Sequence, residues 1–348
     1  MPSDNPSIAQ LAGLRKAFLA LRTAGELAEL LAVSPAHLAA VALRPWYHIF
    51  EVPKKNGEMR LIEDPDDRLQ PIQDGLNDYL QAVYWRQRSD AAYGFLIVPA
   101  GDPAPRHIET NAARHLGRPW LLNCDLDDFF HQITGARVDA LFRGEPFGFD
   151  AELAELLARL TTFRGRCPMG APTSPVLSNL VFAPVDDDLL HLARRRGWTY
   201  TRYADDMSFS SLQPLSWDDY TDVQRCAGKH GYAFNPEKAN LFGPDDAKTI
   251  TGLVLGPKGL EIPHDFIPGV ADDIRQLAGA VQVQYRVNPR GSRTVQRFRR
   301  SVEGKLRFAE RIMGHRHPGV RELWKDYRAA IAPPPAYEAR SWLDFDYW

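Results

Sequence analysis

The sequence predicts an α+β protein, with a body that mixes strands and helices and an end that is helical and cationic. Short β-type runs alternate with helical stretches as far as residue 262. From Ala271 to Arg328 the hydrophobic spacing is mostly helical. Residues 275–328 hold 14 Lys or Arg against four Asp or Glu, so this end also differs from the body in charge.

The composition is that of an ordinary globular protein with an uneven charge distribution. The 348 residues, 44% hydrophobic and 25% charged, are enough for two or three subdomains around a shared core. The net charge is −2, made up of −10 in residues 1–274, +10 in residues 275–328 and −2 in the tail. This distribution favours a protein that binds phosphates with one part and metal ions with another. A solvated helix face is the alternative for the basic segment.

The sequence shows no sign of a membrane or secreted protein. Residues 1–10 lack a basic and then apolar leader, and no apolar run approaches about 18 residues. Cys124, Cys167 and Cys226 lie far apart without CxxC spacing, which indicates neither a zinc site nor a disulfide framework. We therefore expect a reduced, cytoplasmic setting and no membrane partner.

The first elements are expected to be helices followed by a hairpin. Residues 11–31 have helical spacing, and Ser34 and Pro35 are typical of the N-cap and first turn of another helix. Residues 46–52 alternate as a strand does and residues 59–62 return. Asn56 and Gly57 between them suit the positive φ angles of a tight turn.

Helices and strands then alternate through the body. Helices are predicted over residues 69–83, 151–161, 175–192 and 218–230. Strands or extended segments are predicted over residues 121–125, 199–203, 207–211 and 232–242, with a hairpin made by 250–255 and 260–262. Three prolines, at 333–335, separate a tail that holds the aromatic residues Tyr337, Trp342, Phe345, Tyr347 and Trp348. Docking of this tail on its own core and binding of a partner are both open.

The acidic pair Asp205 and Asp206 lies where two β-type runs meet, which predicts a hairpin turn. An acid pair at a turn is often a surface feature only. Asp125 changes the interpretation, because it ends the apolar strand that precedes it in the chain and opens a turn into aromatic residues. Capping of a helix is the alternative for Asp125, Asp127 and Asp128. Three carboxylates from two adjacent strands suit two Mg²⁺ ions about 3.5–4 Å apart, the arrangement used for in-line phosphoryl transfer.

Six motifs in order resemble the reverse transcriptase family, over roughly residues 50 to 314. They are residues 50–57 with Arg60, residues 93–95, Asp125, residues 168–175, residues 203–206, and residues 235–238 followed by 252–256. The resemblance implies a right-hand polymerase with fingers, palm and α-helical thumb. It places an N-terminal helical region at 1–45, fingers at 46–120, palm at 121–265 with 140–175 partly in the fingers, thumb at 266–328 and a tail at 329–348.

Two further motifs resemble the bacterial retron type within that family. Asn111 to His115 fits the pattern NAxxH, and Ile250-Thr251-Gly252 resembles VTG with Ile for Val. Asn111 and His115 stand at i and i+4 of a predicted helix and would share one face. An ordinary hydrogen-bonding pair is the alternative. In the context of the other motifs we expect this face to contact structured RNA.

The resemblance also implies a role for each matching residue. Asp125, Asp205 and Asp206 would be the catalytic metal ligands for Mg²⁺, with Mn²⁺ as a substitute. Lys55 and Arg60 would hold the incoming triphosphate, Phe130 would act as a steric gate against a ribose hydroxyl, and Ala171 would line the nucleotide pocket. Lys238 would protonate the leaving pyrophosphate. Met169 departs from the usual Gln and offers no comparable hydrogen bond, which leaves nucleotide discrimination open.

The basic end is expected to include an amphipathic helix. Val302, Leu306, Ala309 and Met313 form an apolar stripe, and Arg300, Arg307 and Arg311 fall on another face. Such a helix is suited to binding the backbone of an RNA–DNA duplex.

The sequence therefore predicts an RNA-directed DNA polymerase that uses deoxynucleoside triphosphates. Retron resemblance implies that template and primer come from a dedicated noncoding RNA, that synthesis starts at a guanosine 2′-hydroxyl to give msDNA, and that a separate effector protein acts with it in antiphage defence. The alternatives are another bacterial reverse transcriptase, of the diversity-generating or abortive-infection type, and a noncatalytic RNA-binding protein on the same scaffold.

Overall fold

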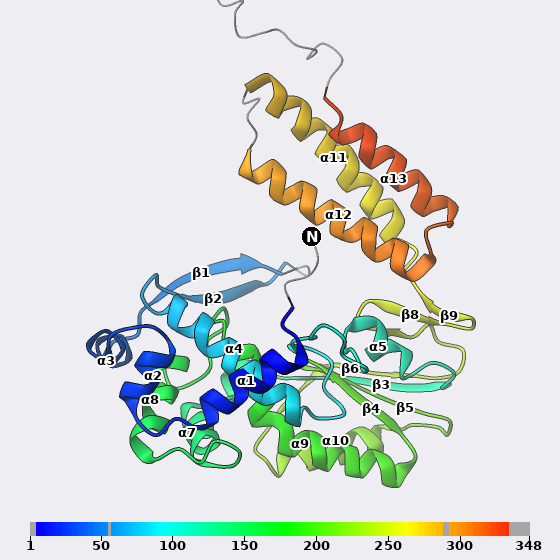
Figure 1. The fold of residues 1–348 in the computed structure, drawn as a ribbon. Helices are drawn as coiled ribbons and strands as arrows, with labels where there is room; N and C mark the ends of the chain where they lie inside the picture. The colour runs from blue at the N-terminus through cyan, green and yellow to red at the C-terminus, as the bar shows by residue number, and fades with distance from the viewer. Residues whose placement is uncertain (1–4, 55–56, 288–291, 334–348) are drawn as a thin grey trace, which may run out of the picture. The chain divides into compact units, whose positions relative to one another are not determined.

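A computed structural model describes residues 5–54, 57–287 and 292–333 of the chain (Figure 1). These residues fall into two compact units, Met1–Thr251 and Gly252–Trp348. Helices combine with antiparallel strands in unit 1, and three long helices follow a short hairpin in unit 2. The predicted α+β class is confirmed.

The N-terminal part of unit 1 is helical, but its first predicted helix is interrupted. Where one helix was expected over residues 11–31, the chain forms α1 (Ile8–Leu19) and α2 (Ala24–Leu30). Thr23 accepts a hydrogen bond from the backbone of Glu26, whose side chain in turn caps Thr23, so a capping box starts a new helix there. Ser34 caps α3 (Pro35–Leu43) as predicted.

An antiparallel hairpin follows, made of β1 (Tyr47–Pro53) and β2 (Met59–Pro65). Its register runs from Tyr47 opposite Pro65 to Pro53 opposite Met59. The predicted tight turn includes Asn56, which lies outside the described residues, as does Lys55.

The centre of unit 1 is a four-stranded antiparallel sheet in the order β4-β5-β3-β6. Its strands are β3 (Trp120–Leu126), β4 (Thr199–Tyr203), β5 (Asp206–Ser211) and β6 (Phe234–Phe242). The long helix α9 (Ser174–Arg196) packs against β4 and against α10 (Trp217–Gly228) on one side of the sheet (Figure 1). The predicted strands and helices of this region are confirmed to within a few residues.

The remaining elements of unit 1 complete its core. They are α4 (Gln70–Gln87), α5 (Ile108–Ala113), α6 (Phe129–Gln132), α7 (Gly135–Arg143), α8 (Ala151–Thr161) and β7 (Thr249–Ile250). Phe18, Phe142, Phe147 and Phe149 pack edge to face or stacked in this core. In the described part of the chain, no single helix is long and apolar enough to cross a membrane, although α2 and α3, bent by 106°, pass a length and composition test as a pair.

Unit 2 begins with the hairpin β8 (Leu253–Gly256) and β9 (Gly259–Glu261). Three helices follow: α11 (Phe266–Val287), α12 (Arg293–Met313) and α13 (Pro318–Ile331). The predicted stripe of α12 is confirmed, because Val302, Leu306 and Ala309 are fully buried and Met313 is half-buried. In the core of unit 2, Val302 and Leu306 cluster with Leu277 of α11 and Leu323 of α13.

Candidate active site

The acidic pair stands at a two-residue hairpin turn between β4 and β5. Tyr203 pairs with Asp206, so Ala204 and Asp205 form the turn itself. Ala204 has φ 61°, a left-handed conformation that a residue with a side chain adopts only when its surroundings hold it. The turn is therefore fixed by contacts from outside the hairpin.

Asp125 lies directly opposite Asp206 in the antiparallel pairing of β3 with β5. Asp125 is buried, Asp205 is half-buried, and Asp206 is exposed. Partial desolvation and then the charge of Asp125 raise the pKa of Asp205. Partial desolvation, followed by repulsion from Asp205 and Asp125, raises the pKa of Asp206 to about 7. The predicted gathering of the three acids is present in the structure.

Lys238, on β6, contacts this cluster. Its Nζ donates a hydrogen bond to Asp125 Oδ1 at 2.8 Å. Burial opposes the charge on Lys238, but the hydrogen bond and the charge of Asp125 outweigh it and raise the pKa of the amine. Lys238 thus lies among the acids, as expected for a residue that acts at the same site.

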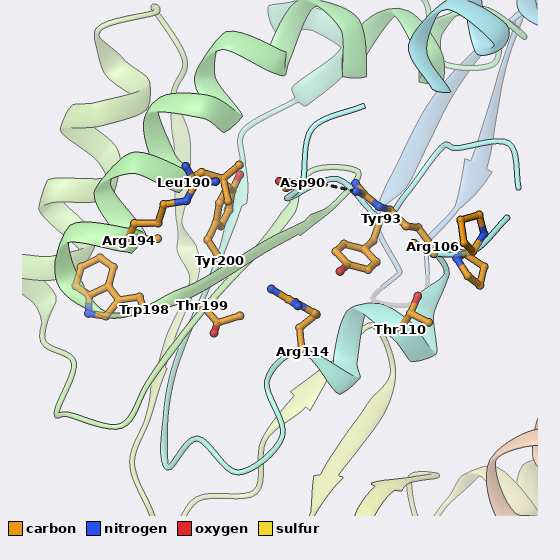
Figure 2. Close-up of a pocket in the computed structure, with 14 residues that line it drawn as sticks. Asp90, Tyr93, Arg106, Thr110, Arg114, Leu190, Arg194, Trp198, Thr199 and Tyr200 are labelled. Atoms are coloured by element: carbon orange, nitrogen blue, oxygen red, sulfur yellow. Dashed lines mark hydrogen bonds and ion pairs between the residues drawn. The ribbon is translucent and has the colours of Figure 1, made fainter. Parts of the chain in front are cut away.

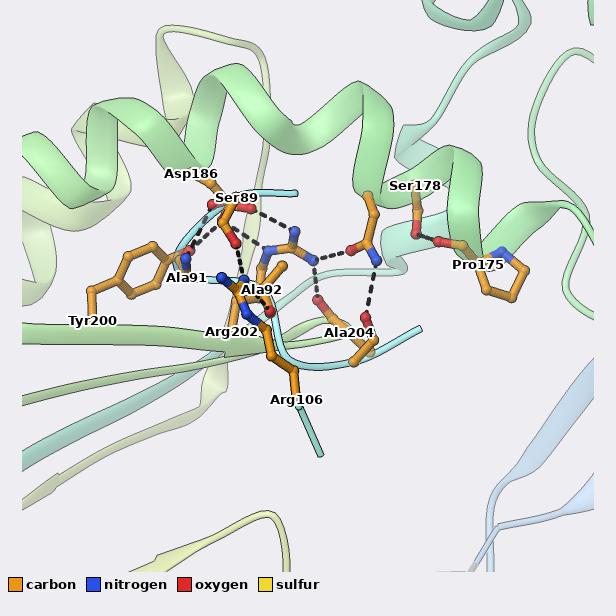
Figure 3. A network of polar contacts seen from close by, with 12 residues as sticks. Ser89, Ala91, Ala92, Arg106, Pro175, Ser178, Asp186, Tyr200, Arg202 and Ala204 are labelled. Atoms are coloured by element: carbon orange, nitrogen blue, oxygen red, sulfur yellow. Dashed lines mark hydrogen bonds and ion pairs between the residues drawn. The ribbon is translucent and has the colours of Figure 1, made fainter. Parts of the chain in front are cut away.

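A buried arginine holds the turn from behind (Figure 3). Arg202 has no exposed surface, and its guanidinium forms a two-point ion pair with Asp186 of α9, at 2.9 Å and 2.6 Å. Its Nη1 also donates to the carbonyl oxygen of Ala204 at 2.9 Å. Arg202 therefore connects the strained residue of the turn to the long helix α9.

Asn179 and Gly94 complete this support. Asn179 accepts a hydrogen bond from Arg202 at 3.0 Å and donates one to the carbonyl of Gly94 at 2.9 Å. A Cβ atom at Gly94 would lie 2.7 Å from the backbone nitrogen of Ala204, which is too close for any other residue without a shift of backbone. The loop around Gly94 thus packs directly on the acidic turn.

Sequence reasoning did not identify Arg202, Asp186 or Asn179. One signal was available: an Arg in the middle of a β-type run of Tyr and Thr residues has to find a partner if that strand is buried. The run of acids at 186–188 on the preceding helix was the source of that partner.

The residues at 168–171 lie against the hairpin β1–β2. The backbone N–H of Glu63 donates to the carbonyl of Met169 at 2.7 Å. Gly170 has φ 131°, and a Cβ atom there would lie 2.8 Å from the carbonyl oxygen of Glu63. Ala171 is buried and Met169 is half-buried. This close packing brings the hairpin and the predicted nucleotide residues Met169 and Ala171 together.

The other predicted nucleotide residues fall around the same site. Arg60, on β2, is exposed and close enough to oppose the rise in the pKa of Asp205. Phe130 is half-buried, with its ring 5.8 Å from Phe95 and 5.9 Å from Phe129. Asp128 occupies the N-cap position of α6 without a capping hydrogen bond, and pairs with His131.

The expected RNA contact of Asn111 and His115 does not fit the structure. α5 ends at Ala113, so His115 lies beyond the helix and the two residues do not share a helix face. Asn111 is 1% exposed and His115 is 0% exposed. The His115 ring nitrogens lie 2.7 Å from Ser210 Oγ and 2.7 Å from Thr201 Oγ1. His115 therefore attaches the end of α5 to the sheet and has no surface to offer RNA.

This buried histidine leads to a pH prediction. Burial, and then the nearby charges of Arg118 and Arg114, lower the pKa of His115 from 6.5 to about 3. The folded state disfavours the protonated ring, whereas the unfolded state accepts a proton near pH 6.5. The free energy of unfolding is therefore highest above pH 6.5 and falls as the pH drops toward 3. Between pH 7 and pH 5 we expect wild type to lose about 2 kcal/mol more of its unfolding free energy than His115→Gln. Urea unfolding at both pH values measures this, with exposed His37→Gln as control; parallel losses in all three proteins would contradict it.

The three predicted arginines of unit 2 are exposed on α12. Arg307 forms an ion pair with Glu303 at 2.7 Å, and Arg311 lies with its guanidinium 5.8 Å from the ring of Phe308. Within the described part of the unit, the side chain of Arg300 forms no hydrogen bond or ion pair. All three stand off the buried stripe, as the helical spacing predicted.

The acid cluster has the chemistry of a site for a hard divalent cation. Its donors are carboxylate oxygens only, and partial desolvation, followed by the charges of neighbouring carboxylates, raises the pKa values of Asp205 and Asp206. Among the described residues, no three His, Cys, Asp or Glu side chains are already arranged so that together they could hold a metal ion. Asp125 is contacted by Lys238 and Asp206. The residues fit a cation in donor type and charge.

Comparison with known proteins defines the class. Residues 52–255 match the family "Reverse transcriptase (RNA-dependent DNA polymerase)". Because this match covers more than half of the chain and includes all three acids, the chain belongs to the reverse transcriptase family. Enzymes of this family use divalent metal ions.

Curated relatives identify the type within the family. The chain is 36% identical over 234 residues to the retron Mx65 reverse transcriptase of Myxococcus xanthus, covering 60% of this chain and 51% of that protein. It is 31% identical over 273 residues to the retron Mx162 reverse transcriptase of the same organism, covering 70% and 53%. It is 30% identical over 223 residues to the retron Ec86 reverse transcriptase of Escherichia coli, covering 63% and 66%. The predicted resemblance to the bacterial retron type is confirmed.

The chain spans about half the length of the two Myxococcus relatives. Among solved structures, a telomerase from Candida albicans with a telomeric RNA fragment matches with a TM-score of 0.44 and 9% identity, covering 84% of this chain and 64% of that one. A foamy viral protease-reverse transcriptase with double-stranded DNA matches with a TM-score of 0.36 and 15% identity, covering 82% and 44%.

Proposed function

We propose that this protein is the RNA-directed DNA polymerase of a retron, which copies a dedicated noncoding RNA into single-stranded DNA. One observation carries the proposal: Asp125 and Asp206 face each other on adjacent strands with Asp205 beside them. Membership of the reverse transcriptase family and similarity to retron enzymes support it.

The proposed reaction is attack of a primer hydroxyl on the α-phosphorus of a deoxynucleoside triphosphate, with pyrophosphate as the leaving group. Asp125, Asp205 and Asp206 would hold Mg²⁺, or Mn²⁺ in its place, and the bound ion would neutralise charge on the reacting phosphate and lower the pKa of the primer hydroxyl. Arg202 would keep Asp205 and Asp206 in place through the carbonyl of Ala204. Lys238 would donate a proton to the leaving pyrophosphate.

The nucleotide would be held by residues of the hairpin and of the loop at 168–171. Arg60 and Lys55 would bind the phosphates of the nucleotide. Met169 and Ala171 would line the part of the pocket that holds its base and sugar. The packing of Gly170 on Glu63 supports this grouping, because it fixes the loop against the strand that carries Arg60.

Phe130 would exclude ribonucleotides, which gives a direct prediction. Its ring is held against Phe95 and Phe129, so it is rigid enough to exclude a 2′-hydroxyl. Phe130→Ala should raise the use of ribonucleotides relative to deoxynucleotides by about 10-fold or more. Single-nucleotide extension on an RNA template measures the ratio, and the matched control is Phe163→Ala, another half-buried phenylalanine. A ratio unchanged from wild type in both variants would exclude the gate.

The helices of unit 2 would form the thumb and hold the RNA–DNA duplex. The exposed arginines at 300, 307 and 311 of α12 support phosphate contacts, and the predicted subdomain bounds of fingers, palm and thumb remain part of this proposal. The expected partners are the cognate noncoding RNA, its hybrid with DNA, and a separate effector protein. Together they would act in antiphage defence in the cytoplasm.

Sequencing of the nucleic acid that copurifies with the protein tests the retron assignment. A branched RNA–DNA hybrid, in which DNA is joined to an internal guanosine of an RNA, is expected. Recovery of DNA copied from many unrelated RNAs would favour a diversity-generating or abortive-infection enzyme instead. RNA without attached DNA, from a protein that cannot extend a primer, would favour the noncatalytic alternative.

A further inference from the structure

A cavity of about 660 Å³ opens in unit 1 at the outer edge of β4 (Figure 2). Asp125, Asp205 and Asp206 are not among the residues that line it. β4 is one of the two edge strands of the four-stranded sheet. Residues of α5 line the cavity on one side and residues of α9 on the other. The proposed polymerase reaction gives this cavity no role.

The cavity is cationic. Three arginines and one acid, Asp90, are among its lining residues. Arg106 is committed to the protein, because it donates to the carbonyls of Ser89 and Ala92 (Figure 3) and pairs with Asp90 (Figure 2). Arg114 and Arg194 are exposed, and within the described residues their guanidinium groups have no hydrogen bond or ion pair. Two uncommitted guanidinium groups at one cavity favour a ligand that carries phosphate.

An aromatic ring stands beside these charges. Trp198 is half-buried, with its ring edge-on to Phe209 at 6.2 Å, and Figure 2 shows it next to Arg194 at the wall of the cavity. A fixed aromatic ring next to arginine is the combination on which the bases of single-stranded nucleic acids stack.

The backbone of β4 adds hydrogen-bonding groups at the same place. On the outer edge, the backbone N–H of Arg202 donates a hydrogen bond to the carbonyl of Ala91, and the backbone carbonyl of Arg202 accepts one from the N–H of Tyr93. Because backbone direction alternates along a strand, Tyr200 directs its own N–H and C=O to this edge, and neither has a backbone partner there among the described residues. The segment at 91–93 covers the rest of the edge. One residue is too short a site for an added peptide strand, but it offers one donor and one acceptor to a base.

We propose that this cavity binds one nucleotide of a single-stranded nucleic acid, with its phosphate at Arg114 and Arg194, its base on Trp198 and the base edge at the backbone of Tyr200. The inference rests on the proposed function only for the source of the strand, which would be the RNA outside the copied duplex. It assigns this edge of the sheet a second contact with nucleic acid, separate from the acids.

Binding of a labelled 12-nucleotide single strand by the full chain tests the proposal, in EDTA and without nucleotides so that polymerisation plays no part. Arg114→Gln with Arg194→Gln should weaken binding by about 10-fold or more and reduce its salt dependence. The control, Arg195→Gln with Arg225→Gln, removes the same charge from exposed positions outside the cavity and should stay within about twofold of wild type. Comparison of the affinities for an RNA strand and a DNA strand of the same sequence shows whether the site recognises the 2′-hydroxyl.

Photocrosslinking from a thiolated base to wild-type protein supplies a measurement that needs no variant. Crosslinks at Trp198 or Tyr93 support the proposal. Equal losses of affinity in the two double variants, with crosslinks only elsewhere, would overturn it, and this is also the result expected if the cavity takes a peptide. A protein that crosslinks here but fails to extend a primer would refute the polymerase function and leave this site standing.

Discussion

Asp205→Asn combined with Asp206→Asn is expected to abolish complementary DNA synthesis, with a loss of about 1,000-fold or more. The change removes two of the three carboxylates gathered at the ends of β3 and β5 and leaves the shapes of the side chains almost unchanged. Neutral amides neither balance the charge of a divalent cation nor hold it against the reacting phosphate. Primer extension on an RNA template, with Mg²⁺ and all four deoxynucleotides, measures the loss.

The same variant should be at least as stable as wild type. The raised pKa values of both acids mean that the folded state resists their ionisation, so neutral replacements relieve repulsion. Asp245→Asn with Asp246→Asn alters another adjacent pair of acids, exposed in a loop, and should keep normal synthesis. Normal synthesis by the Asp205 and Asp206 variant, or an equal loss in the loop variant, would show that the acid cluster does not carry the reaction.

Arg202→Met is expected to lower the unfolding free energy by about 3–5 kcal/mol. It leaves the fully buried Asp186 carboxylate without its partner, and it removes the hydrogen bond to the carbonyl of Ala204. Denaturant unfolding measures the loss. Arg196→Met breaks surface ion pairs with Asp219 and Asp222 and should cost about 1 kcal/mol or less.

A double variant separates stability from positioning. Arg202→Met with Asp186→Leu removes both buried charges, which should restore most of the stability. The turn still lacks its hydrogen bond from Arg202, so kcat should stay at least about 10-fold below wild type at saturating nucleotide. If kcat recovered together with stability, Arg202 would be a structural residue only.

The acid cluster was predictable from the sequence because each part depends on local pattern. A strand ending in Asp125 and a turn at 204–205 follow from hydrophobic period and chain order, and adjacent strands then bring the acids together. The stripe on α12 was predictable for the same reason. The break at Thr23 was harder, because apolar spacing continues through a capping box that ends the helical backbone.

What could not be predicted depends on contacts between distant segments. Burial of Arg202 requires Asp186 on the helix behind the strand, and nothing in the spacing shows which face of that helix meets the sheet. The pair Asn111 and His115 was misplaced because helical spacing does not reveal that α5 ends at Ala113. The His115 side chain then turns into the sheet, where two hydroxyl groups satisfy its ring.

Incorporation of deoxynucleotides by the purified protein on a primed RNA template, titrated with Mg²⁺, tests the central claim most directly. The account predicts RNA-templated DNA synthesis that requires the divalent cation and disappears when Asp125 is replaced by Asn. Failure to extend any primer on an RNA template at any Mg²⁺ or Mn²⁺ concentration, by a protein that is folded and binds RNA, would contradict it.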